Sequence, residues 1–195
     1  MPNPKTGELP VRLFKDDAAW EAWLAREHAR SPGILLRIAR AASNVKSVSY
    51  PEALDVALCY GWIDGQRKSL DDTTWLQKFT PRTKRSMWSK VNREKVQRLV
   101  ESGRMQPPGL EAVDRAKANG QWDAAYDPQR TAGVPEDLQL ALYANPKAKA
   151  FFATLSSQNR YAILFRIQGV KRAETRARKI EQFVGMLERH EVFHP

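Results

Sequence analysis

Hydrophobic and polar residues are spaced as in strands at four places in the first half of the chain. This pattern predicts short strands over residues 11–14, 34–38, 66–70 and 74–80. Asp71-Asp72 lies between the last two stretches and is typical of a hairpin turn. These four segments predict a small antiparallel sheet.

Hydrophobic residues three and four positions apart predict helices around these strands. One helix begins at Ser49, where Glu52 three residues later completes a capping box, and it is expected to end near Gly61. Two more helices are predicted over residues 89–101 and 110–119. The first part of the chain therefore combines helices with a sheet.

Beyond a polar segment at residues 127–134, only helical patterns remain. The last helix has the most regular amphipathic spacing, formed by Ala173, Ala177, Ile180, Val184 and Leu187. The predicted class is α+β, with a polar arm over residues 1–10, an α+β domain over 11–126, a linker over 127–134 and a helical C-terminal lobe over 135–195.

The charge balance favours acidic partners. The 195 residues include 32 Lys and Arg against 22 Asp and Glu, a formal net charge of +10. Such a surface attracts nucleic acid, anionic membranes or phosphorylated small molecules. The alternative is a basic protein without a dedicated anion site.

Cysteine content and hydrophobicity indicate the compartment. Cys59 is the only cysteine, so no disulfide can form within the chain, and a reducing environment is expected. The first eight residues have no apolar core of a secretory signal, and no apolar run approaches the roughly 20 residues that span a bilayer. We expect a cytoplasmic protein without a membrane span.

A basic segment interspersed with aromatic residues is the main candidate for a binding site. Residues 82–98 carry seven Lys or Arg and one Glu. Basic side chains bind phosphates, and flat aromatic rings stack on bases or sugars. The candidate anion-binding residues are Trp62, Asp64, Arg82, Lys84, Arg85, Ser86, Trp88, Ser89 and Asn92. Alternatively, Ser89 only caps a helix, the tryptophans belong to the core and the charges form a solvated face.

A catalytic interpretation of the same segment also stays open. Asp64 would act as the acid or base, and Arg82 would bind a small anionic substrate. The alternative for Asp64 is a turn residue that accepts hydrogen bonds from nearby backbone N–H groups. Cys59 has no histidine near it in sequence and is interpreted as a buried apolar residue.

We expect neither a metal nor a cofactor. Residues 190–194 match H-E-x-x-H, but they end the sequence, where a firm helix and a third zinc ligand are not expected. No phosphate loop or dinucleotide fingerprint is present. A second basic run, residues 171–179, is interpreted as a solvated helix face or as part of a basic groove.

Several motifs in order resemble one known family over roughly residues 31–190. The strongest are Tyr50-x-Glu52-Ala53-Leu54, Ala57-Leu58-Cys59-x-Gly61-Trp62-Ile63-Asp64-Gly65 and Phe79-Thr80-Pro81-Arg82-x-x-x-Ser86-x-Trp88-Ser89-x-x-Asn92. These motifs resemble the YdeI/OmpD-associated family of bacteriocin-protection proteins. The resemblance implies stress or antimicrobial-peptide resistance and association with an outer-membrane porin, and it implies no defined reaction.

Two functional hypotheses follow. The first is a non-catalytic binding module for an anionic ligand or polyanion, with a role in stress or bacteriocin protection. The second is an enzyme that acts on a small anionic substrate through Asp64 and Arg82. A purely structural or partner-docking role is the third possibility.

Overall fold

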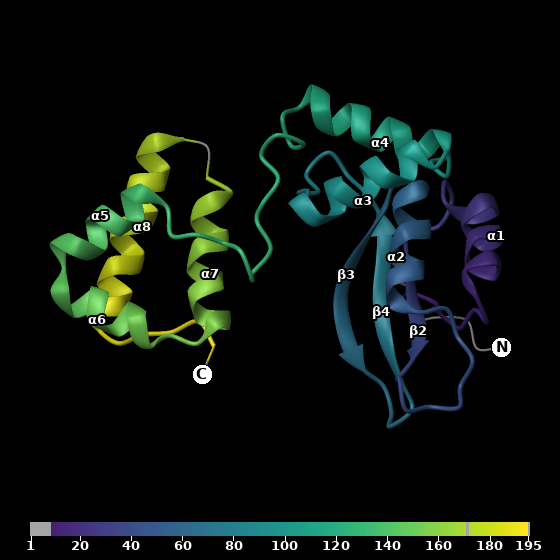
Figure 1. Ribbon diagram of the computed structural model, residues 1–195, viewed down its shortest axis with the longest axis horizontal. Helices are drawn as coiled ribbons and strands as arrows, with labels where there is room; N and C mark the ends of the chain where they lie inside the picture. Colours follow the sequence, from purple (N-terminus) through teal and green to yellow (C-terminus); the bar gives the residue numbers. More distant parts are fainter. Residues whose placement is uncertain (1–8, 171, 195) are drawn as a thin grey trace. The chain divides into compact units, whose positions relative to one another are not determined.

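The computed structural model describes residues 9–170 and 172–194, which form a four-stranded sheet and eight helices (Figure 1). In chain order the elements are β1 (Val11–Arg12), α1 (Asp17–Glu27), β2 (Ile34–Ala39), α2 (Tyr50–Cys59), β3 (Trp62–Ser69), β4 (Thr74–Pro81), α3 (Lys90–Glu101), α4 (Pro107–Ala118), α5 (Glu136–Ala144), α6 (Pro146–Thr154), α7 (Ser157–Gln168) and α8 (Ala173–Glu188). The α+β class is confirmed. Most of the predicted polar arm, residues 1–8, lies outside the described residues, as do Lys171 and Pro195.

The strand order in the sheet is β1-β2-β4-β3. The pairs β2–β4 and β4–β3 are antiparallel, as predicted, whereas β1 runs parallel to β2. The prediction of a purely antiparallel sheet is therefore wrong at this edge. Helix α1 lies between β1 and β2 in the chain, and such a crossover returns the chain so that both strands point the same way.

Helix α2 begins and ends as its sequence predicts. The Ser49 hydroxyl caps the helix, and the Glu52 carboxylate accepts a hydrogen bond from the Ser49 backbone N–H at 2.9 Å. The helix ends before Gly61, whose φ of +71° lies in the left-handed region that glycine tolerates best. Strand β3 starts directly afterwards at Trp62, four residues before the predicted strand, because Trp62 already pairs with Pro81 of β4.

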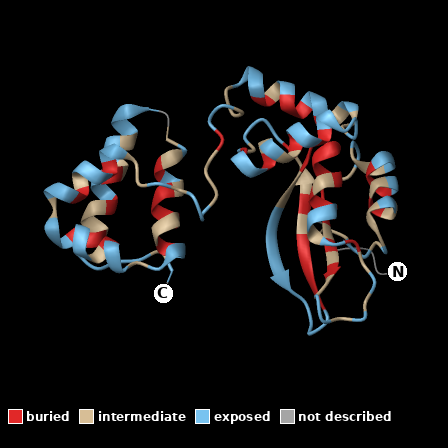
Figure 2. Cartoon of the chain, viewed as in Figure 1, coloured by how far each residue is buried: buried red, intermediate tan, exposed pale blue. Residues whose placement is uncertain are grey.

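An aromatic core lies beside the sheet in the first half of the chain. Trp20 and Trp23 of α1 stack at 5.3 Å, and Trp62 meets both edge-on. Phe79 of β4 packs against Trp20 and is fully buried. Figure 2 shows that β4 is largely buried, whereas β3 is exposed along its second half.

Helix α4 approaches the end of α2 very closely. A Cβ atom built on Gly109 would lie 2.2 Å from the Cys59 carbonyl oxygen, so only glycine fits at this contact. The Gln106 N–H also donates to the Cys59 carbonyl, at 3.2 Å. These contacts hold α4 against the helix that precedes β3.

The contacts divide the chain into two compact units. The first extends to Trp88 and includes Asn92–Asp123, and the second contains Ser89–Val91 and the chain from Ala124 onward. The core of the second unit is formed by Leu138, Leu142, Ala148, Phe152, Ile163, Leu164, Ile167, Ile180, Phe183 and Leu187, which come from α5, α6, α7 and α8.

Candidate functional site

The predicted anion-binding segment forms a loop after β4, which we call the basic loop (residues 82–88). Arg82 is only 6% exposed, and its backbone N–H donates to the Gly61 carbonyl at 2.9 Å. Its guanidinium lies 3.5 Å from the centre of the Trp88 ring and donates to the Met87 carbonyl at 3.1 Å. Arg82 and Trp88 therefore join the two ends of the loop.

The middle of the basic loop is a tight, hydrogen-bonded turn. The Thr83 N–H donates to the Ser86 hydroxyl at 2.9 Å, and the Ser86 N–H donates to the Thr83 carbonyl at 3.1 Å. The Asn119 side chain donates to the Lys84 carbonyl at 3.3 Å. The side chains of Lys84 and Arg85 are exposed at this turn. The turn thus fixes the backbone and leaves two cations in solvent.

Ser89 and Asn92 do not extend this exposed surface. Ser89 is 8% exposed and forms an isolated β-bridge with Tyr126. Asn92 lies in the first turn of α3 and is 9% exposed. The two side chains predicted to contact an anion are therefore largely buried.

Trp62 and Asp64 lie on β3, away from the turn in sequence. Trp62 is buried in the aromatic core, and its indole N–H donates to the His28 carbonyl at 3.3 Å. Asp64 accepts a hydrogen bond from the Tyr50 hydroxyl at 2.9 Å. Asp64 is therefore a strand residue bonded to a side chain of α2, and its interpretation as a turn residue is wrong.

Several cations of the wider basic segment are engaged within the protein. Lys90 pairs with Asp127 at 2.6 Å, and Lys95 pairs with Asp55. Arg93 donates to the Trp122 carbonyl at 2.7 Å. In the part of the chain that the structure describes, Lys84, Arg85 and Arg98 are exposed and form no ion pair.

The cysteine and the H-E-x-x-H motif occupy structural positions. Cys59 is 1% exposed, and burial raises the pKa of its thiol to about 11, so the thiolate nucleophile is disfavoured. Helix α8 ends at Glu188, so His190 and His194 do not share a helix face. His190 instead stacks on Phe151 at 4.5 Å. Within the described residues, no group of three or more His, Cys, Asp or Glu is arranged to hold a metal ion.

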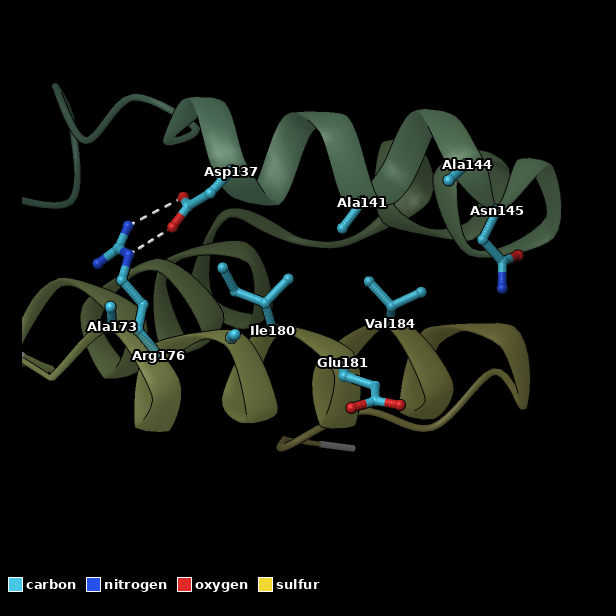
Figure 3. Close-up of a pocket in the computed structure, with 10 residues that line it drawn as sticks. Asp137, Ala141, Ala144, Asn145, Ala173, Arg176, Ile180, Glu181 and Val184 are labelled. Atoms are coloured by element: carbon cyan, nitrogen blue, oxygen red, sulfur yellow. Dashed lines mark hydrogen bonds and ion pairs between the residues drawn. The ribbon is translucent and has the colours of Figure 1, made fainter.

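A groove of about 540 Å³ lies between α5 and α8 in the second unit (Figure 3). Ala141, Ile180 and Val184 line it, with Ala173 and Ala177 along α8. The amphipathic spacing of α8 includes Ala173 and Ala177, yet both are exposed and line the groove. The amphipathic spacing along α8 is therefore the sequence signal for this groove. The same spacing is also found in helices that pack against a closed core, so it does not predict a groove by itself.

Polar groups stand at both ends of the groove. At one end Arg176 pairs with the two carboxylate oxygens of Asp137 (Figure 3), and it also donates to the Ile167 carbonyl at 2.9 Å. At the other end the Asn145 amide donates to Glu188 at 3.0 Å. The groove can accept an apolar group, while its polar ends are occupied by hydrogen bonds within the protein.

Two comparisons with family models identify parts of the chain. Residues 12–112 match the family described as a domain of unknown function (DUF8412). This segment covers more than half of the chain. The chain belongs to the DUF8412 family. The DUF8412 region contains α1 to β4, α3 and the basic loop.

Residues 131–190 match the family described as Bacteriocin-protection, YdeI or OmpD-Associated. The predicted resemblance is therefore confirmed for residues 131–190, which contain the helices from α5 to α8. The motifs between residues 50 and 92 that suggested it lie in the DUF8412 region instead. No curated protein and no solved structure matches the chain.

Proposed function

We propose that this protein is a non-catalytic binding module for a polyanion, which it contacts through the basic loop. The observation that carries the proposal is the pair of exposed cations, Lys84 and Arg85, on a turn held in place by the Arg82–Trp88 stack. A fixed backbone reduces the entropy lost when these side chains bind. Nucleic acid is the polyanion that we consider first.

The composition and the form of the loop support an extended ligand. The formal net charge of +10 attracts polyanions from a distance. Exposed lysine and arginine side chains bind phosphate groups without reading a particular sequence. We therefore expect little sequence preference and a strong dependence on salt.

The catalytic alternative is less well supported by the geometry. Arg82 is buried against Trp88 and bonded to the Met87 carbonyl, which suits an anchor of the loop better than a clamp for substrate. Asp64 already accepts a hydrogen bond from the Tyr50 hydroxyl. We therefore assign Arg82 and Trp88 a positioning role in the proposed site.

The family match suggests the biological setting. The name of the family matched by residues 131–190 refers to bacteriocin protection and to association with OmpD. We propose that polyanion binding serves stress or bacteriocin protection, and a cytoplasmic location remains our prediction. Of the helices that the structure describes, none has the length and hydrophobicity needed to cross a bilayer.

Fluorescence anisotropy with a labelled single-stranded oligonucleotide tests the proposal, with heparin as a chemically different polyanion. The double substitution Lys84→Gln/Arg85→Gln removes both exposed cations, and we expect the Kd to rise about tenfold or more. Arg30→Gln/Lys46→Gln is the matched control, because both residues are exposed in the first unit and form no ion pair with a described residue.

The control should change the Kd by less than about twofold, since it removes the same charge from another part of the surface. An equal loss of affinity in both double variants would show that net charge alone drives binding. That result, or unchanged binding in Lys84→Gln/Arg85→Gln, would contradict the proposed site.

A further inference from the structure

A second cavity with two arginines lies in the second unit, at the start of α7. Its volume is about 380 Å³, and its polar lining consists of Gln129, Arg130, Ser157, Arg160 and Tyr161. Its lining residues include no carboxylate. The charge of this cavity is therefore positive, in contrast to the apolar groove between α5 and α8.

Arg160 is the most informative side chain of this cavity. Its Nε is buried and has no hydrogen-bond partner among the residues that the structure describes. One terminal nitrogen donates to the Ala153 carbonyl, at a long 3.3 Å, and the guanidinium lies 5.4 Å from the Phe152 ring. A buried guanidinium N–H without an acceptor is costly, because it has lost water and gained nothing in return. Because Arg160 also lines the cavity, its guanidinium can bind an oxyanion there.

Other groups around the cavity suit the same ligand. Arg130 is exposed and forms neither an ion pair nor a side-chain hydrogen bond with any described residue, so its five donors are available. Ser157 is the first residue of α7, where the helix end adds partial positive charge. The Tyr161 hydroxyl donates to the Asp127 carbonyl at 3.0 Å, which fixes one wall of the cavity.

We propose that this cavity binds the oxyanion group of a small molecule, a phosphate or a carboxylate, between Arg130 and Arg160. Guanidinium groups bind both oxyanions through paired, charge-assisted hydrogen bonds. A volume of about 380 Å³ exceeds that of one oxyanion and lies in the range of small-ligand sites, so the ligand carries a further compact group. This site is separate from the basic loop and takes a different class of ligand.

Nitrogen-15 NMR of the 195-residue chain tests the site directly, with sodium phosphate, pyrophosphate and succinate titrated at constant ionic strength. We expect saturable shifts of the backbone amides of residues 157–160 and of the Arg160 Nε–H resonance. The phosphates and succinate distinguish a phosphate ligand from a carboxylate ligand. Sodium chloride at the same ionic strength should leave these resonances unchanged.

Three variants locate the binding. Arg130→Gln and Arg160→Gln should each raise the Kd about tenfold, because each removes a charge-assisted pair of hydrogen bonds. Arg178→Gln is the matched control, since Arg178 is exposed on α8 and does not line the cavity, and its Kd should stay within about twofold. If Arg160→Gln disturbs the fold, the exposed Arg130 alone decides the outcome.

The absence of saturable shifts at residues 157–160 with all three anions would overturn the proposal, as would equal affinities in Arg130→Gln and Arg178→Gln. Lys84→Gln/Arg85→Gln should retain the shifts, because the basic loop belongs to the first unit. The polyanion proposal and the oxyanion proposal can therefore be contradicted independently of each other.

Discussion

At the scale of single residues, Arg82 holds the proposed binding surface in shape without contacting the ligand itself. Its guanidinium covers one face of Trp88 and closes the basic loop onto the Met87 carbonyl. The planar guanidinium suits both interactions, and a lysine ammonium would reproduce the charge without the stacking geometry. Lys84 and Arg85 are exposed because other residues hold the turn.

Arg82→Ala should lower the free energy of unfolding of the first unit by about 2–4 kcal/mol, from the lost stacking and charged hydrogen bond. Arg82→Lys should recover less than half of this loss. Urea denaturation followed by tryptophan fluorescence measures the effect, because all six tryptophans lie in the first unit. Unchanged stability together with lost ligand binding would instead identify Arg82 as a direct contact.

Gly109 illustrates a position where the side chain must be absent. In Gly109→Ala the new Cβ would lie 2.2 Å from the Cys59 carbonyl oxygen, so α4 must move away from α2. We expect a loss of about 2–3 kcal/mol, despite the higher helix propensity of alanine. Thermal unfolding monitored by circular dichroism measures it.

Gly133→Ala is the matched control, since an added Cβ at Gly133 meets no described atom within 4 Å. Its stability should change by less than about 0.5 kcal/mol. Equal effects of the two substitutions would show that the close contact between α4 and α2 contributes little.

At the scale of elements, one arginine connects three helices of the second unit. Arg176 of α8 binds Asp137 of α5 and the last turn of α7, so it connects three of the four helices. The hydrogen bonds from Arg176 lower the pKa of Asp137. Because the folded pKa lies below the unfolded value, the carboxylate stabilises the fold above its unfolded pKa of about 3.8. That stabilisation is lost as the pH falls through the folded pKa.

Asp137→Asn should therefore make the free energy of unfolding of the second unit depend less on pH in the acid range. Near pH 6 we expect a loss of about 1 kcal/mol or less, because Asp137 is 44% exposed and solvent screens the pair. Near pH 3 the difference from the parent should shrink. Circular dichroism reports this unfolding, and tryptophan fluorescence serves as the control because the first unit should not respond.

A constant difference between Asp137→Asn and the parent from pH 6 to pH 3 would contradict the assigned role of the carboxylate. It would indicate that the substitution acts through packing against α8, since packing does not titrate in this range.

Local signals predicted the elements well where neighbours in sequence decide the structure. The capping box of Ser49 and Glu52 and the turn at Asp71 both formed, and Asp71 accepts hydrogen bonds from the Thr73 and Thr74 backbone N–H groups. The parallel pairing of β1 was missed because two residues carry too little pattern to define a direction. The early start of β3 depends on pairing with β4, which is a contact between distant residues.

At the scale of the whole molecule, both units carry basic residues, but few of these residues belong to either of the two proposed sites. The sequence analysis included Lys84 and Arg85 among the candidate residues, and the structure leaves both side chains exposed. Burial of Trp62, Ser89 and Asn92 followed from tertiary packing, which residue type alone does not reveal. The cavity of Arg130 and Arg160 joins residues thirty positions apart, so no local motif pointed to it.

The dependence of oligonucleotide affinity on salt tests the proposed polyanion site most directly. For a single strand, the logarithm of the binding constant falls with the logarithm of salt concentration with a slope of about −0.7 per phosphate neutralised. We predict that Lys84→Gln/Arg85→Gln makes this slope shallower by about 1.4, as expected for two lost phosphate contacts, and that Arg30→Gln/Lys46→Gln leaves it unchanged. The same slope in all three proteins would contradict contact of the polyanion with the basic loop.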